Sequence, residues 1–140
     1  MMKLLVTMFA ATVLTVALSC EEKRVPIYNQ VMAIDQRLTL KIFTLDRMKN
    51  VLKDSIARNP DMASETKSRM EQSILQLDSA SNAILRWKGQ FIIPNDKEAL
   101  DKFSTEQLVK IKEVRRYVLK VIESNKGIVN DKNRTTEPLY

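Results

Sequence analysis

The residue with the most distinctive chemistry is Cys20, the only cysteine in a chain of 140 residues. It follows an apolar segment, residues 4–18, with Lys3 before that segment and the small residue Ser19 after it. This order is typical of a bacterial secretory signal whose cleavage leaves a cysteine that becomes attached to lipid. The apolar segment is about 15 residues long, whereas a membrane-spanning helix needs about 20. An uncleaved membrane anchor is therefore the weaker interpretation.

Ordinary secretion is the other alternative, because Ala17-Leu18-Ser19 also fits the small-x-small cleavage rule. Ala17 occupies the third position before the cysteine, where the commonest lipoprotein signal has leucine. A single thiol exported without a partner to an oxidising compartment would be reactive, and this favours lipidation. We expect a signal peptide at 1–19, then a lipidated Cys20 with a short tether over 20–25. The expected location is the bacterial cell envelope, anchored through fatty acyl chains such as palmitate in the outer membrane, on its periplasmic or outward face.

Other chemistry has few candidate residues. The chain has no histidine, so serine and cysteine triads and the usual zinc, haem and di-iron sites lack their components. Glu98, Asp101 and Glu106 could bind a cation, but carboxylates without an apolar pocket around them are usually solvated. Residues 130–133 have the composition of a calcium loop but lack its turn glycine and its closing glutamate. We therefore predict no enzymatic activity, no metal site and no cofactor.

Three helices must position any functional surface. Apolar residues recur at alternating spacings of four and three over 26–58, which is typical of one packed helical face. They are Ile27, Val31, Ile34, Leu38, Leu45, Met48 and Leu52. The same pattern continues over 61–91 and 96–125. These ranges predict an all-α fold, an elongated antiparallel three-helix bundle with coiled-coil-like packing over 26–127. An open hairpin that dimerises is the alternative, and the sequence does not determine the oligomeric state.

Proline, asparagine and glycine mark the predicted ends of these helices. Pro60 cannot continue the first helix but fits the first turn of the second, with Asn59 or Asp61 as its cap. Pro94 ends the second helix, and Asn95 with Glu98 has the form of a capping box for the third. Ser104-Thr105 is a second possible cap, at which the third helix could bend or restart. Gly127 is expected to cap its end, followed by a flexible tail over 128–140.

The third predicted helix also carries a local excess of positive charge. The formal net charge of the chain is +6, and five basic residues accompany the single acid Glu113 over 110–120. We call these five residues the basic stripe: Lys110, Lys112, Arg115, Arg116 and Lys120. A solvated helix face is the ordinary interpretation of such a run. Because export argues against nucleic acid, the functional interpretation is binding to anionic lipid or to an acidic envelope protein.

Trp87 and Phe91 could line a ligand site, but their helical spacing favours core packing. Residues 28–34, residues 87–94 and the sequence Lys97-Glu98-Ala99-Leu100 together resemble short bacterial lipoproteins labelled "viral A-type inclusion protein". That resemblance implies a helical lipoprotein and no viral role, and the family offers no established activity to transfer. We expect a non-enzymatic, lipid-anchored helical interaction or structural module. The alternative is a small-ligand or lipid-binding carrier that opens around Trp87 and Phe91.

Overall fold

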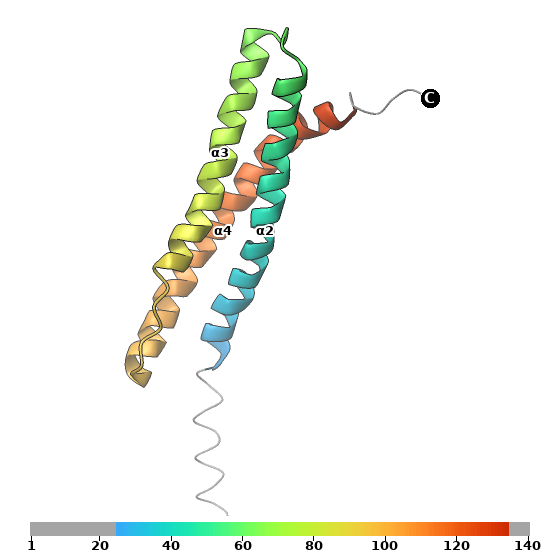
Figure 1. Cartoon of the computed structure of the whole chain (residues 1–140). Coiled ribbons are helices and arrows are strands. Elements are labelled where there is room, and N and C mark those ends of the chain that lie inside the picture. Colours follow the sequence, from blue (N-terminus) through green and yellow to red (C-terminus); the bar gives the residue numbers. More distant parts are fainter. Residues whose placement is uncertain (1–24, 135–140) are drawn as a thin grey trace, which may run out of the picture.

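A computed structural model describes residues 25–134, which form three α-helices. They are α2 (Val25–Arg58), α3 (Ser64–Gly89) and α4 (Lys97–Arg134). The helices run up, down and up as an elongated bundle in which every pair is in contact, and α4 crosses the α2–α3 pair at an angle (Figure 1). The prediction of an all-α three-helix bundle is confirmed. The predicted signal peptide, Cys20 and its tether as far as residue 24 lie outside the described residues.

The core follows a seven-residue repeat on each helix, as expected for coiled-coil-like packing. On α2 the repeat is Val31, Leu38, Leu45 and Leu52, on α3 it is Met70, Leu77 and Ile84, and on α4 it is Ile111, Val118 and Asn125. Each of these side chains is at most 1% exposed. Ile27 was expected on the same face but is 37% exposed. Its exposure follows from the length of α3, which ends before reaching the level of the first turns of α2 (Figure 1).

The turn between α2 and α3 differs from the prediction. The Asn59 side-chain amide donates to the carbonyl of Ser55 at the end of α2, at 2.8 Å, so this side chain belongs to the end of α2. The backbone N–H of Met62 donates to the carbonyl of Asn59 at 3.1 Å, which places Pro60 inside a β-turn that suits its fixed φ. Helix α3 then begins at Ser64 behind Ala63, which makes no side-chain capping bond. The prediction of Asn59 or Asp61 as the cap is wrong.

The connection between α3 and α4 spans residues 90–96. Gln90 closes α3 by donating its backbone N–H to the carbonyls of Arg86 and Trp87, at 3.2 and 3.1 Å. The cap of α4 is Asp96, whose Oδ2 accepts from the backbone N–H of Ala99 at 2.9 Å. The predicted capping box on Asn95 is therefore wrong by one residue. A carboxylate at this position also interacts favourably with the positive end of the helix dipole.

Helix α4 is continuous past both points at which we expected an interruption. At the predicted restart, the Thr105 hydroxyl donates to the carbonyl of Asp101 inside the helix, at 2.9 Å. Gly127 does not end the helix either, because α4 continues to Arg134. A glycine inside a helix costs about 1 kcal/mol relative to alanine. Burial of Val129, 7% exposed, offsets that cost. The prediction of a tail over 128–134 is wrong, and 135–140 lie outside the described residues.

Candidate functional site

The five residues of the basic stripe all lie in the middle of α4, and all are exposed. Successive residues in a helix are rotated by about 100°. Lys112, Arg116 and Lys120, at spacings of four, therefore form one line on the face opposite the buried core positions. Lys110 and Arg115 lie on opposite sides of that line. The structure thus brings three of the five together and places the other two on the flanks.

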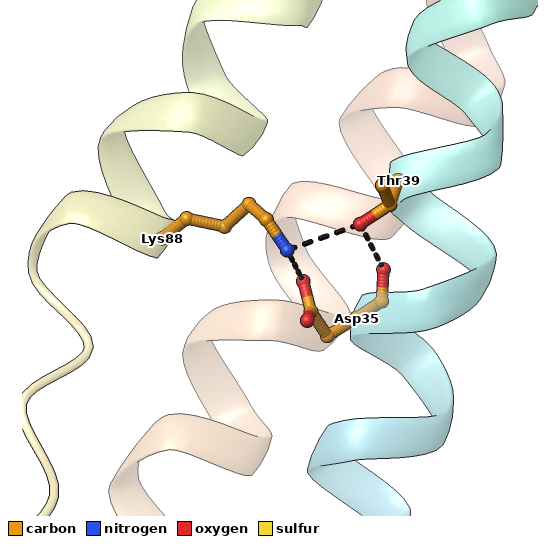
Figure 2. A network of polar contacts seen from close by, with 3 residues as sticks. All are labelled: Asp35, Thr39 and Lys88. Carbon is orange, nitrogen blue, oxygen red and sulfur yellow. Dashed lines mark hydrogen bonds and ion pairs between the residues drawn. The ribbon is translucent and has the colours of Figure 1, made fainter.

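The lysines of the α2–α3 seam behave differently, because carboxylates neutralise them. Lys88 of α3 reaches Asp35 of α2, with 2.5 Å between Nζ and Oδ1, and also donates to the Thr39 hydroxyl at 3.0 Å (Figure 2). The same hydroxyl donates to the backbone carbonyl of Asp35 at 2.9 Å. Only 14% of the Asp35 side chain is exposed, so this pair is partly shielded from solvent. Lys88 therefore links α3 to α2 through an ion pair and a hydrogen bond.

A second ion pair joins the same two helices nearer the α2–α3 turn. In this ion pair the lysine is Lys49 of α2. Its Nζ lies 2.8 Å from Asp78 Oδ1 on α3 and 3.1 Å from Asp46 Oδ1 on its own helix. The hydrogen bond that Lys49 donates to Asp78, followed by the one it donates to Asp46, raises the pKa of Lys49 above its ordinary value of 10.5. In both contacts a carboxylate of the bundle itself compensates the positive charge of the lysine.

The basic stripe has no such compensation. Within residues 25–134, none of its five side chains forms an ion pair with a carboxylate, and nearby Lys126 pairs with Glu123 instead. Exposed apolar side chains lie among these charges, since Val109 is 57%, Tyr117 41% and Leu119 40% exposed. Val109 precedes Lys112 by three residues and Arg116 by seven, which places it on the same line of the helix. This face can attract an anionic surface and also offer it apolar contact.

Trp87 and Phe91 pack as expected. Trp87 is 6% exposed and belongs to the core, and its ring lies 5.0 Å from that of Phe91, which in turn lies 5.2 Å from Phe103 on α4. The Trp87 indole N–H donates to Gln107 Oε1 at 3.0 Å in a buried contact. The prediction of core packing is confirmed. Sequence reasoning missed Gln107, although its position four residues after Phe103 and four before Ile111 is a core position.

The carboxylates considered as cation ligands do not form a site. In the part of the chain that the structure describes, no group of three or more histidine, cysteine, aspartate or glutamate side chains is arranged to hold a metal ion. Glu98 and Glu106 are exposed, and Asp101 is half-buried. None of the helices in this part of the chain is both long enough and apolar enough to span a membrane.

Comparisons with known proteins add no relative. No protein-family model matches the chain. No curated protein matches it, and no solved structure does. The resemblance to short bacterial lipoproteins therefore stays a prediction from the sequence.

Proposed function

We propose that the chain is a lipid-anchored protein of the bacterial cell envelope that acts as a non-enzymatic helical interaction module. The observation that carries the proposal is the position of Cys20, the only cysteine, between an apolar export segment and a helix that begins at Val25. A diacylglyceryl group on the thiol and an acyl chain on the amine would each bury methylene groups in the bilayer. At about 0.8 kcal/mol per methylene, several chains give stable attachment.

The partner surface in this proposal is the outer face of α4. Lys112, Arg116 and Lys120 are exposed and form no ion pair within the described bundle, unlike Lys49 and Lys88, whose charges the bundle itself uses. An uncompensated basic line attracts anionic lipid headgroups or the acidic face of an envelope protein. Val109, Tyr117 and Leu119 supply apolar contact at the same surface. In this proposal the positive charges attract the anionic partner, and the apolar side chains then pack against it.

The anchor is tested by the intact mass of the membrane-extracted protein, compared with a Cys20→Ala variant. We expect the native chain to begin at Cys20 and to carry acyl groups, and the variant to lack them. An unmodified mature chain in the soluble fraction would mean that ordinary secretion applies and would remove the tether from the proposal.

The partner surface is tested by crosslinking in intact cells. In one variant Lys112, Arg116 and Lys120 are changed to glutamine. In a matched control Lys53, Lys67 and Arg69, exposed residues of α2 and α3 with no ion pair in the described bundle, are changed in the same way. We expect crosslinked species that the first variant loses and the control keeps. Equal loss in both would indicate a response to net charge alone and would contradict a specific surface on α4.

A further inference from the structure

The connection between α3 and α4 carries the most exposed large apolar side chain in the described part of the chain. Ile92 is 77% exposed, and the adjacent Ile93 is 48% exposed. They stand within four consecutive apolar residues, Phe91-Ile92-Ile93-Pro94. Phe91 and Pro94 are half-buried, so Ile92 and Ile93 make up the exposed apolar surface of this run. Connections are usually polar, and an exposed apolar patch on one can mark an interaction site. The helix period does not account for it, because these residues belong to no helix.

Phe91 is the residue of this apolar run that packs against the core, whereas the two isoleucines that follow it stay exposed. Its ring lies between those of Trp87 and Phe103, at centroid distances of 5.0 and 5.2 Å. Its backbone N–H donates to the carbonyl of Lys88 at 3.1 Å, and on the other side Asp96 fixes the start of α4. The connection is therefore held at both ends, with Ile92 and Ile93 outward.

The position of this connection in the fold indicates what covers it. Because the helices run up, down and up, the α3–α4 connection lies at the end of the bundle where α2 begins (Figure 1). Cys20 precedes Val25, the first residue of α2, by five positions. Five residues reach at most about 18 Å. A membrane that holds Cys20 therefore lies close to this end, where Ile27 in the first turns of α2 is also 37% exposed.

We infer that Ile92 and Ile93 insert into the interfacial region of the bilayer that holds Cys20, as a second lipid contact that orients the bundle. The inference rests on the proposed lipidation of Cys20. Apolar side chains that enter the boundary between headgroups and acyl chains add to the attachment that acyl groups provide. The acyl anchor alone keeps this end of the bundle near the membrane but leaves the tilt of the helices free, and a second contact at the same end restricts that tilt.

The test uses the full-length, membrane-extracted protein in vesicles of phosphatidylethanolamine and phosphatidylglycerol. Because acylation blocks the thiol of Cys20, an Ile92→Cys variant carries one free thiol, which is labelled with a polarity-sensitive fluorophore. Leu75→Cys is the matched control, since Leu75 is 66% exposed and lies on α3 towards the other end of the rod. We expect a blue shift and quenching by spin-labelled lipid for the label at position 92, and neither at position 75.

The other outcomes separate this inference from the proposed function. Acylated, vesicle-bound protein in which neither label responds would overturn the lipid contact and leave the lipid anchor intact. Equal quenching at both positions would mean that the rod lies along the membrane, and would also overturn the inference. Protein without acyl groups by mass would refute both proposals. Circular dichroism of each variant verifies the fold, which exposed substitutions should leave unchanged.

Discussion

The two connections of the bundle contain the same turn-forming residues but present different surfaces. The first contains Asn59-Pro60-Asp61 and the second Pro94-Asn95-Asp96. In the first, Asn59, Pro60 and Asp61 are exposed, and the one large apolar residue, Met62, is half-buried against the core. In the second, Ile92 and Ile93 are exposed. Reversing the chain thus requires proline, asparagine and aspartate, but it does not require exposed isoleucine.

This difference gives the rod a polar end and an apolar end. Each connection is fixed by its own hydrogen bonds, Asn59 to Ser55 in one case and Asp96 to Ala99 in the other. The apolar surface at the second connection is therefore not a by-product of a loose loop. Variants that remove contacts at one connection, or add a contact at the other, measure how much each connection contributes to the free energy of unfolding.

The largest effect is expected at the base of the apolar connection, in Trp87→Ala. Removing a buried tryptophan costs about 3–5 kcal/mol in the free energy of unfolding. In addition, Gln107 loses the indole N–H that satisfies its buried oxygen, and Phe91 loses its ring partner. Chemical denaturation of the mature domain measures the loss. Trp87→Phe is the control, since it keeps a ring but not the N–H donor, and it should lose clearly less.

A loss below about 0.5 kcal/mol in Trp87→Ala, the level of an ordinary surface change, would contradict this expectation. It would mean that the aromatic cluster does not hold the connection in place. Ile92→Ser supplies the contrast, because a side chain that is 77% exposed in the bundle should change the free energy of unfolding by less than about 0.5 kcal/mol.

The second largest effect concerns the start of α4. Asp96→Ala removes the carboxylate that accepts from the backbone N–H of Ala99, and loss of such a cap costs about 1 kcal/mol. Asp96→Asn keeps an acceptor and should be close to neutral. The free energy of unfolding by urea distinguishes the two variants. An equal loss in both would indicate that the charge at the helix end, and not the hydrogen bond, is what stabilises α4.

The start of α3 allows the reverse change at the polar end. Ala63 has the extended φ and ψ of a capping residue, −51° and 133°, but no side-chain acceptor. Ala63→Asp should therefore raise the free energy of unfolding by about 0.5–1 kcal/mol, because it supplies the missing acceptor. Glu65 in the first turn reduces the gain by repulsion. A destabilised variant would show that the turn at 59–62 depends on a small residue there.

The heptad core was predictable because its period persists over whole helices and ends only where the helices do. The caps were not predictable, because Asn59, Asp61, Asn95 and Asp96 all carry a side-chain acceptor that suits a helix start, and the sequence alone does not say which of them takes that position. The prediction that α4 ends at Gly127 failed for another reason. Glycine favours the end of a helix, but the burial of Val129 against the other helices outweighs that preference.

The candidate site was predictable in composition but not in arrangement. The sequence identified all five residues of the basic stripe. The structure was needed to show that these five residues form no ion pairs within residues 25–134, whereas the lysines of the α2–α3 seam do. The exposure of Ile92 and Ile93 could not be predicted, because four consecutive apolar residues indicate burial. Only the folded bundle shows that Phe91 is the one of these residues that joins the aromatic cluster with Trp87 and Phe103.

The smallest expected change in the free energy of unfolding depends on pH. It distinguishes Lys49, which forms ion pairs, from Lys53, which forms none in the described bundle. Because Asp78 and then Asp46 raise the pKa of Lys49 above 10.5, its contribution to stability is fully present below pH 10.5 and is lost as the pH rises through the raised pKa. Lys49→Met should cost about 0.2–1 kcal/mol near neutral pH. That difference from the native chain should shrink under strongly alkaline conditions. Lys53→Met, on an exposed position of α2 without an ion pair in the described bundle, should show no such trend. A difference at Lys49 that does not change with pH would mean that the aliphatic stem of the lysine, and not its charge, joins α2 to α3.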